Sequence, residues 1–212
     1  TIDETINSVI NQSYNNLEYI IIDGKSKDTT LSIINKYQNK IDKIISENDK
    51  GLYYAMNKGI KLATGDVIGI LNSDDLFFSN NTLKHIVEQF KNNQKLQLLY
   101  GNILYFNSSD YKVKRFWKSD SYFEKFFDFG NVPPHPSVFV RKEIYKKDVF
   151  NVSFKIAADY ELLIRLLKKK KIKSYFLNKT IVKMRDGGIS TSRENLIKQN
   201  KDLRTHNEFF KN

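Results

Sequence analysis

The stretch of residues 48–75 constrains the fold of this chain most strongly. Its apolar residues recur at helical spacing, at Leu52, Ala55, Met56, Gly59, Ile60 and Ala63. Such a one-sided stripe predicts an amphipathic helix that packs on a flat surface and is closed by Gly65. The apolar run 67–71 follows; it is too short for a helix and too continuous for a half-exposed strand, so it predicts a strand buried on both faces. This combination is typical of an α/β protein in which helices cover a mainly parallel sheet.

Two adjacent carboxylates stand where this predicted strand ends, in the sequence Asn72-Ser73-Asp74-Asp75. In open α/β folds, ligands bind at the carboxyl ends of the strands. Carboxylate oxygens suit Mg²⁺ or Mn²⁺, with water and a phosphorylated substrate completing the coordination. The same four residues are also ordinary turn chemistry, so the tetrad alone leaves both interpretations open.

The rest of the chain continues the alternation of strands and helices. We predict helices at 2–12, 26–37, 82–90 and 157–167 and strands at 17–22, 41–46, 96–106 and 138–140. Short connections between such elements indicate βαβ units. With 212 residues and 40% apolar content, the chain is large enough for one well-buried domain. We therefore predict a single domain over residues 1–212.

The composition limits the cellular compartments in which the protein is expected. The chain has no cysteine, which excludes disulfides and thiolate metal sites. No apolar run reaches the ~18 residues of a membrane span, and Asp3 and Glu4 stand where a signal peptide would carry positive charge. We therefore expect a cytoplasmic protein.

A net charge of +11 calls for an anionic partner, such as nucleic acid, anionic lipid or a diphosphate-bearing substrate. The densest cluster, Lys168–Lys171 with Lys173, follows a helical pattern, where cations favour the helix C-terminus. This ordinary interpretation is preferred over a dedicated binding patch.

Residues 111–129 combine many aromatic and basic side chains, among them Trp117. Ser121 and Glu124 match a capping box and predict a short helix with an aromatic face. Such aromatics can stack on sugars or enter a bilayer interface, although packing in the core is the more common role.

Several motifs in this order resemble glycosyltransferase family 2. They are Ile22–Thr29, Asp49–Gly59, Ala63–Asp66, Leu71–Asp75, Pro134–Phe139 and Ala158–Leu162. The resemblance covers nearly the whole chain. It implies the GT-A (nucleotide-diphospho-sugar transferase) fold, Rossmann-like, with a nucleotide-sugar-binding half at 1–106 and an acceptor half at 107–212.

The resemblance also implies a reaction and its residues. A sugar would move from a nucleotide-diphosphate sugar, expected to be a UDP-sugar, to a hydroxyl of a glycan or lipid-linked oligosaccharide in bacterial polysaccharide biosynthesis. Asp159 would be the base that takes the acceptor's proton. The resemblance assigns the remaining site residues as follows: Asp75 with Asp74 for Mn²⁺ or Mg²⁺, Asp23, Asp49, Asn57 and Asp74 for the donor, and His135 and Trp117 for the acceptor side. Peripheral contact with an anionic membrane would suit the charge and the aromatics.

Three features depart from the family pattern. Family members open with an apolar strand before the first helix, so we expect this sequence to be a fragment that lacks it. Asp23 is followed by Gly24, where many members carry a second carboxylate linked to base recognition. Asn72 replaces the first acid of the Asp-x-Asp motif, so the metal site would rest on two acids. The turn at 186–190 resembles the donor-side closing loop of the family.

An alternative of another class is a basic module that binds nucleic acid or a membrane surface and has lost catalysis. A nucleotidyltransferase would need a glycine-rich phosphate loop near its start, and the sequence shows none. Because Asp74, Asp75 and Asp159 are all present, we favour the glycosyltransferase and expect no nucleic-acid partner.

Overall fold

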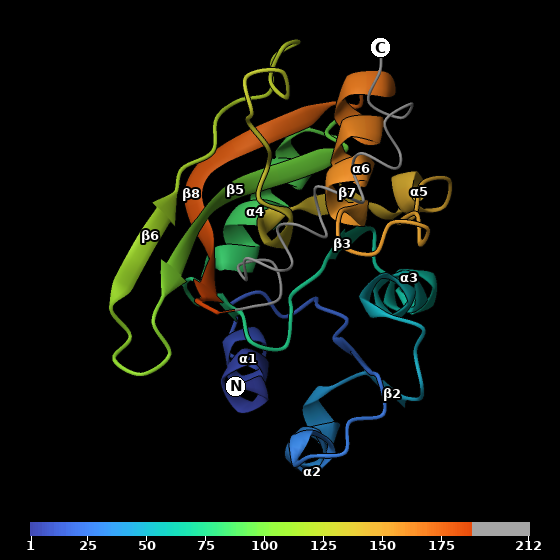
Figure 1. Cartoon of the computed structure of the whole chain (residues 1–212), viewed down its shortest axis with the longest axis vertical. Helices are drawn as coiled ribbons and strands as arrows, with labels where there is room; N and C mark the ends of the chain where they lie inside the picture. The colour runs from blue at the N-terminus through green and yellow to red at the C-terminus, as the bar shows by residue number, and fades with distance from the viewer. Residues whose placement is uncertain (188–212) are drawn as a thin grey trace.

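The computed structural model describes residues 1–187 and has an α/β fold (Figure 1). The helices are α1 Ile2–Ile10, α2 Thr30–Lys36, α3 Leu52–Leu62, α4 Thr82–Asn92, α5 Lys142–Tyr145 and α6 Ala158–Ile164, with short helices η1 Gln38–Lys40, η2 His135–Ser137 and the π-helical η3 Arg165–Lys169. The strands are β1 Ile20–Asp23, β2 Lys43–Ser46, β3 Val67–Gly69, β4 Leu76–Phe77, β5 Leu98–Phe106, β6 Val113–Trp117, β7 Phe139–Arg141 and β8 Ser174–Arg185. The predicted tail beyond Thr191 and most of the predicted closing loop lie outside the described residues.

The strands form two separate sheets, and the larger one is mixed. β1 and β2 pair in parallel, as the strand–helix–strand alternation predicts. In the larger sheet, with the order β3-β7-β5-β8-β4 and β6 beside β5, only β5 and β8 are parallel neighbours. The prediction of a mainly parallel sheet is thus wrong for this sheet. A turn joins β5 to β6, and a long irregular segment brings β7 back from the opposite end, so neither pairing has the helical crossover that parallel strands need.

α1, β1, α2 and β2 form an N-terminal layer at one end of the molecule, and the curled larger sheet with α6 lies at the other (Figure 1). Glu18 links the two regions, because its carboxylate accepts hydrogen bonds from Lys43 Nζ of β2 at 2.6 Å and from Thr64 N, just before β3, at 2.5 Å. α3 packs on β1, with Gly59 close to the Ile22 side chain.

The predicted strand 67–71 is shorter and less buried than its sequence indicates. β3 ends at Gly69, and of its three residues only Ile68 is buried. One edge of β3 pairs with β7, whereas the residues of β3 and β1 line a common cleft on the other side. The apolar side chains of β3 are therefore partly exposed to this cleft instead of being covered on both faces.

Two helices predicted from the sequence differ from those in the structure, and the causes are local. The helix predicted at 26–37 begins at Thr30, because Asp23 holds the Ser26 backbone and Asp28 Oδ1 accepts from Thr30 N at 3.0 Å. The helix predicted from the Ser121–Glu124 capping box is absent; residues 121–123 are irregular and 124–130 form turns. Phe126 and Phe127 of its predicted aromatic face nevertheless belong to the core, at 1% and 8% exposed, whereas Phe123 is 42% exposed.

The buried apolar side chains gather in three clusters. Two of them lie on the larger sheet, one beneath α6 and the other beneath α4. A third, much smaller cluster belongs to the N-terminal layer and consists of Ile6, Ile21, Ile34 and Ile41. Among the described residues, no helix is long and apolar enough to cross a membrane.

Candidate active site

A cleft of about 2050 Å³ opens between the N-terminal layer, α3, α6 and the larger sheet. Five of the predicted site residues line it together: Asp74, Asp75, Trp117, His135 and Asp159. They come from distant parts of the chain, namely the turn after β3, the end of β6, the η2 turn and the first turn of α6. The cleft therefore brings the predicted metal-binding carboxylates and the predicted base to one space.

The Asp74–Asp75 turn is fixed by its own side chains and by α1. Asn72 Nδ2 donates to Asp75 Oδ2 at 2.9 Å, and Thr5 Oγ1 of α1 donates to the Ser73 carbonyl at 2.9 Å. Asp75 is 1% exposed. Burial raises the pKa of Asp75 to about 7, against the opposing effect of the Asn72 hydrogen bond. The positive charge of Arg185 also opposes this rise in the pKa of Asp75 without cancelling it.

The chain itself offers few metal ligands at this point. Within residues 1–187, no group of three or more His, Asp or Glu side chains could hold a metal ion. A metal in this cleft would therefore depend on the carboxylates of Asp74 and Asp75, with most of its coordination left to substrate and water.

Asp159 stands in the first turn of α6 with its carboxylate in the cleft. Its Oδ1 atom accepts from Tyr160 N at 2.9 Å and from the Tyr53 hydroxyl at 3.1 Å. Tyr53 belongs to α3, so the candidate base is contacted from two helices. Sequence spacing gave no sign of this contact, because the two residues are far apart in the chain.

His135 and Trp117 line the same cleft. The His135 ring meets the Phe150 ring edge to face, with 5.3 Å between centroids. Trp117, at the end of β6, lies under the guanidinium of Arg115, which is 5.2 Å from the indole centroid. Both residues therefore belong to the cleft lining, and their acceptor-side role stays a prediction.

The carboxylate of Asp23, a predicted donor-binding residue, already accepts hydrogen bonds from other residues of the chain. It is 6% exposed and accepts from Ser26 Oγ at 2.5 Å and from Ser46 Oγ at 2.6 Å. Burial alone would raise the pKa of Asp23, but these hydrogen bonds outweigh it and hold the pKa below its ordinary value. Asp23 thereby ties the carboxyl ends of β1 and β2 together.

Among the described residues, one carboxylate oxygen of Asp49 is paired and the other is not. Its Oδ1 atom pairs with Lys58 Nζ at 2.5 Å, and the same ammonium contacts Glu47 at 2.7 Å. Its Oδ2 atom is buried and has no hydrogen-bond partner among the described residues. A buried acceptor without a donor is costly. Asp49 is not among the residues that line the cleft, so its predicted contact with the donor stays a prediction.

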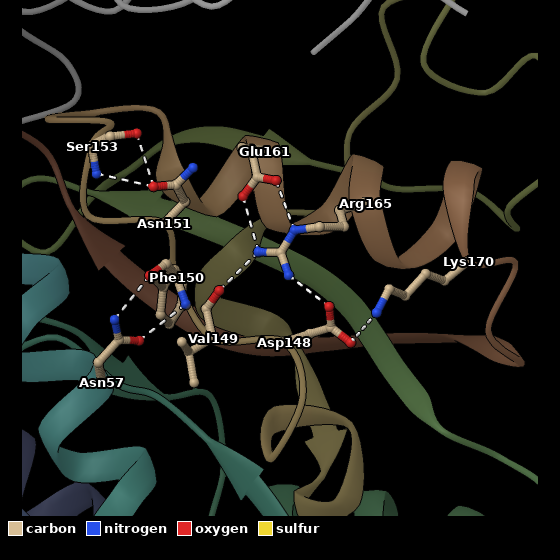
Figure 2. A network of polar contacts seen from close by, with 9 residues as sticks. All are labelled: Asn57, Asp148, Val149, Phe150, Asn151, Ser153, Glu161, Arg165 and Lys170. Carbon is tan, nitrogen blue, oxygen red and sulfur yellow. Dashed lines mark hydrogen bonds and ion pairs between the residues drawn. The ribbon is translucent and has the colours of Figure 1, made fainter.

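Asn57 is held by the backbone of Phe150. Its Nδ2 atom donates to the Phe150 carbonyl at 2.9 Å, and its Oδ1 atom accepts from Phe150 N at 3.0 Å (Figure 2). Both ends of the amide are thus engaged, and Asn57 is not among the residues that line the cleft. The structure gives Asn57 a role in fixing the loop at Phe150, and its predicted contact with the donor stays a prediction.

Comparison with known proteins decides the family. The sequence profile described as "Glycosyl transferase family 2" matches residues 1–152, which is more than half of the chain. The chain belongs to glycosyl transferase family 2. The predicted family and its glycosyltransferase activity are thereby confirmed.

Two relatives illustrate the range of this similarity. An uncharacterized glycosyltransferase of Methanocaldococcus jannaschii is 29% identical over 217 residues, covering 96% of this chain and 73% of that protein. The Escherichia coli enzyme WfgD, a UDP-Glc:alpha-D-GlcNAc-diphosphoundecaprenol beta-1,3-glucosyltransferase, is 33% identical over 110 residues, covering 51% of this chain and 43% of WfgD.

Solved structures confirm the GT-A fold of the family 2 transferase. S. aureus TarS in complex with UDP superposes with a TM-score of 0.67 at 19% identity, covering 96% of this chain. The transferase spans 60% of that TarS chain. At this identity the likeness is one of fold.

His135 of the transferase should make stability fall on acidification. Burial lowers the pKa of His135 below its ordinary value of about 6.5, with the Asp159 charge opposing this shift. Below about pH 6.5 the unfolded chain therefore binds a proton that the folded chain does not, so the free energy of unfolding decreases as the pH falls. Chemical unfolding between about pH 5 and 7.5 measures this slope.

In His135→Gln that part of the slope should disappear. His85→Gln, at a partly exposed histidine of α4, serves as the matched control and should keep the wild-type slope. An identical slope in wild type and His135→Gln would contradict the prediction.

An ion-pair network that the sequence interpretation missed braces α6 of the transferase (Figure 2). Arg165 Nε donates to Glu161 Oε1 at 2.7 Å, and its other nitrogens reach Asp148 Oδ1 and the Val149 carbonyl, both at 2.8 Å. Lys170 completes the network by pairing with Asp148 Oδ2 at 2.6 Å. Glu161 and Arg165 stand four residues apart on a helix, a spacing that could have indicated the pair. The network fixes the loop 148–156, which leads into Asp159.

Proposed function

We propose that this transferase moves a sugar from a UDP-sugar to a hydroxyl of a glycan or lipid-linked acceptor, with inversion at the anomeric carbon. The observation that carries the proposal is the common cleft of Asp74, Asp75 and Asp159. UDP as the donor nucleotide is supported by TarS, which has been solved with UDP and with UDP-GlcNAc, and by WfgD, whose name states a UDP-Glc donor.

In the proposed reaction, Asp159 accepts the proton of the attacking acceptor hydroxyl. The acceptor oxygen forms a bond to the anomeric carbon while the bond from that carbon to the diphosphate breaks. The proton remains on Asp159, and the electron pair leaves with the nucleoside diphosphate. One displacement of this kind inverts the configuration, because no second nucleophile takes part.

Asp74 and Asp75 are the residues that would hold Mn²⁺ or Mg²⁺. Their hard oxygen atoms and the raised pKa of Asp75 fit such an ion. When bound, a divalent cation supplies charge neutralisation for the leaving diphosphate. Asp75 is assigned chiefly to the metal, whereas Asp74 would contact the donor.

The donor nucleotide is placed against Asp49 and the start of α3. The buried Oδ2 atom of Asp49 can accept an N–H group of the base, which would satisfy an oxygen that has no donor among residues 1–187. Asp23 supports this region by joining β1 to β2. Its part in donor binding is therefore to shape the site.

His135 and Trp117 are assigned to the acceptor side of the cleft. We place the enzyme peripherally at the cytoplasmic face of the membrane, where a lipid-linked acceptor would be presented. This is supported by the net charge of +11 and by the exposed side chains of Phe116, Phe123 and Phe129 near several lysines. Arg115 on β6 adds to the positive charge beside Trp117.

Calorimetric titration with UDP, GDP and CDP tests the donor assignment directly. Each nucleotide is added in the presence of Mn²⁺ and again with a chelator. The expected result is binding of UDP that weakens when the metal is removed, with weaker binding of the other two. Equal affinity for all three nucleotides, with and without metal, would contradict the proposed donor site.

Asp75→Asn should abolish the metal dependence of UDP binding, because the amide removes the charge that attracts the cation. We expect the affinity measured with Mn²⁺ to fall about tenfold or more, to the value measured with chelator. Asp110→Asn, at an exposed acid that pairs only with Lys112 among the described residues, is the matched control and should bind as wild type does. Full metal-stimulated binding by Asp75→Asn would disprove the assignment.

A further inference from the structure

Tyr53 connects the donor-side helix α3 to the candidate base. Its hydroxyl lies 2.5 Å from the Ile156 carbonyl oxygen and 3.1 Å from Asp159 Oδ1. The side chain is 6% exposed and also lines the cleft. Tyr53 follows closely on the Asp49–Gly51 motif, so a residue next to the proposed donor site touches the residue proposed to activate the acceptor.

The hydroxyl of Tyr53 can act only as a donor to these two oxygens. Burial, reinforced by the nearby charge of Asp159, raises the pKa of Tyr53 well above its ordinary value of about 10. It therefore keeps its proton at every pH at which the enzyme would work. The Asp159 carboxylate and the Ile156 carbonyl can only accept hydrogen bonds, so the two oxygens share the single hydrogen of the Tyr53 hydroxyl.

Because of this contact, the two carboxylate oxygens of Asp159 differ in their hydrogen bonds. Oδ1 accepts from both Tyr53 and the Tyr160 backbone N–H. For Oδ2, no donor is recorded among residues 1–187. Two donors on one oxygen fix the rotation of the carboxylate, which leaves the other oxygen to meet an incoming hydroxyl in the cleft.

The Tyr53 ring is itself held in place. It stacks on the Phe150 ring at 5.5 Å between centroids with an interplanar angle of 25°. Asn57, one turn further along α3, holds the Phe150 backbone through both ends of its amide (Figure 2). His135 packs on the same Phe150 ring. The position of the hydroxyl is thus set by α3 and by the braced loop 148–156 together.

We propose that Tyr53 is a positioning residue for Asp159. It holds Oδ1, so that Oδ2 is presented to the acceptor hydroxyl. In the transfer step the acceptor O–H bond breaks and its proton bonds to Oδ2, while Tyr53 retains its own hydrogen. The inference rests on the proposed function, because it needs Asp159 to be the base, and it adds a residue whose role is to orient that base.

Tyr53→Phe tests the role, with Tyr145→Phe as its matched control. Tyr145 is 2% exposed and packs on the same Phe150 ring at 6.4 Å, and no hydrogen bond of its hydroxyl is recorded within residues 1–187. With a UDP-sugar as donor, Tyr53→Phe should lower kcat about tenfold, as expected for losing a hydrogen bond to a charged group. The KM for the donor and the affinity for UDP should stay within about twofold, and Tyr145→Phe should resemble wild type.

The same substitution made in Asp159→Asn separates positioning from a general structural effect. If Tyr53 acts through Asp159, the Tyr53→Phe substitution should cause no further loss of activity in the Asp159→Asn variant, which already lacks the base. Turnover of Tyr53→Phe equal to that of Tyr145→Phe, or an equal loss with and without Asp159, would overturn the inference. Failure of the proposed function has a different signature: Asp159→Asn alone would then transfer sugar as fast as wild type does.

Discussion

Asp159→Asn should reduce sugar transfer by at least ~10²-fold, the usual effect of losing a general base. The asparagine amide fills the same space at the start of α6 and can still accept the Tyr53 and Tyr160 hydrogen bonds, but it cannot take up the acceptor's proton. UDP binding should be almost unchanged, because the substitution lies on the acceptor side. Steady-state kinetics with a UDP-sugar and calorimetry with UDP measure the two quantities separately.

Glu143→Gln is the matched control for this experiment. Glu143 is an exposed acid in the first turn of α5, so the same loss of one carboxylate charge occurs away from the cleft. This variant should keep wild-type turnover. The base assignment would be falsified if Asp159→Asn retained wild-type turnover as well.

Among substitutions that remove one partner of an ion pair in the described part of the chain, Arg165→Met should lower the free energy of unfolding most. Glu161 has no exposed surface, and the guanidinium of Arg165 contacts both of its carboxylate oxygens. Removing one partner of a buried pair leaves an uncompensated charge and costs about 3–5 kcal/mol. For a chain of this size, such a loss corresponds to a fall in Tm of about 10 °C, measurable by denaturant and thermal unfolding.

Lys170→Met provides the comparison within the same network. The Lys170 side chain is 45% exposed, so its bond to Asp148 should contribute no more than about 1 kcal/mol. The double variant Glu161→Gln/Arg165→Met should recover part of the loss, because it removes the buried charge along with its partner. Equal destabilisation by Arg165→Met and Lys170→Met would show that burial of Glu161 does not govern the energy of this network.

Local patterns predicted the donor side of the fold well. The helix α3, the parallel pair β1–β2 and the turn carrying Asp74 and Asp75 all follow from residues close together in the sequence. The predicted face of α3 was only partly right, because Leu52 is 51% exposed and the buried residues are Tyr53 and Ile60. The helix also ends at Leu62 with Ala63 as its C-cap, and Gly65 does not adopt the predicted left-handed cap conformation. The antiparallel pairing of β7 did not, because the segment before it has no regular element from which a direction could be inferred. The aromatic residues near Phe126 were identified as core candidates, but their burial is achieved in turns instead of a helix.

The site was predictable in its acids and not in the groups that orient them. Asp75 and Asp159 could be singled out by chain order and by resemblance, and the structure brings both to one cleft. Tyr53 lies within the family motif Asp49–Gly59, but the sequence analysis assigned it no role. Its contact with Asp159 joins residues more than a hundred positions apart, and Asn57 likewise finds its partner Phe150 far along the chain. Partners of this kind are fixed by tertiary packing, which periodicity does not encode.

The small separate core of the N-terminal layer has a thermodynamic consequence. Four isoleucines bury far less apolar surface than the two clusters of the larger sheet, so the layer should open locally at a lower free energy than β5 and β8. The proposed donor site, at Asp49 and the start of α3, lies next to this layer, because α3 packs on β1. A nucleotide that bound only when the layer is folded against the larger sheet would stabilise that state by about 2.7 kcal/mol at a hundred times its Kd. Donor binding and ordering of the N-terminal layer would then be thermodynamically coupled, so the bound substrate would add to the stability of that layer.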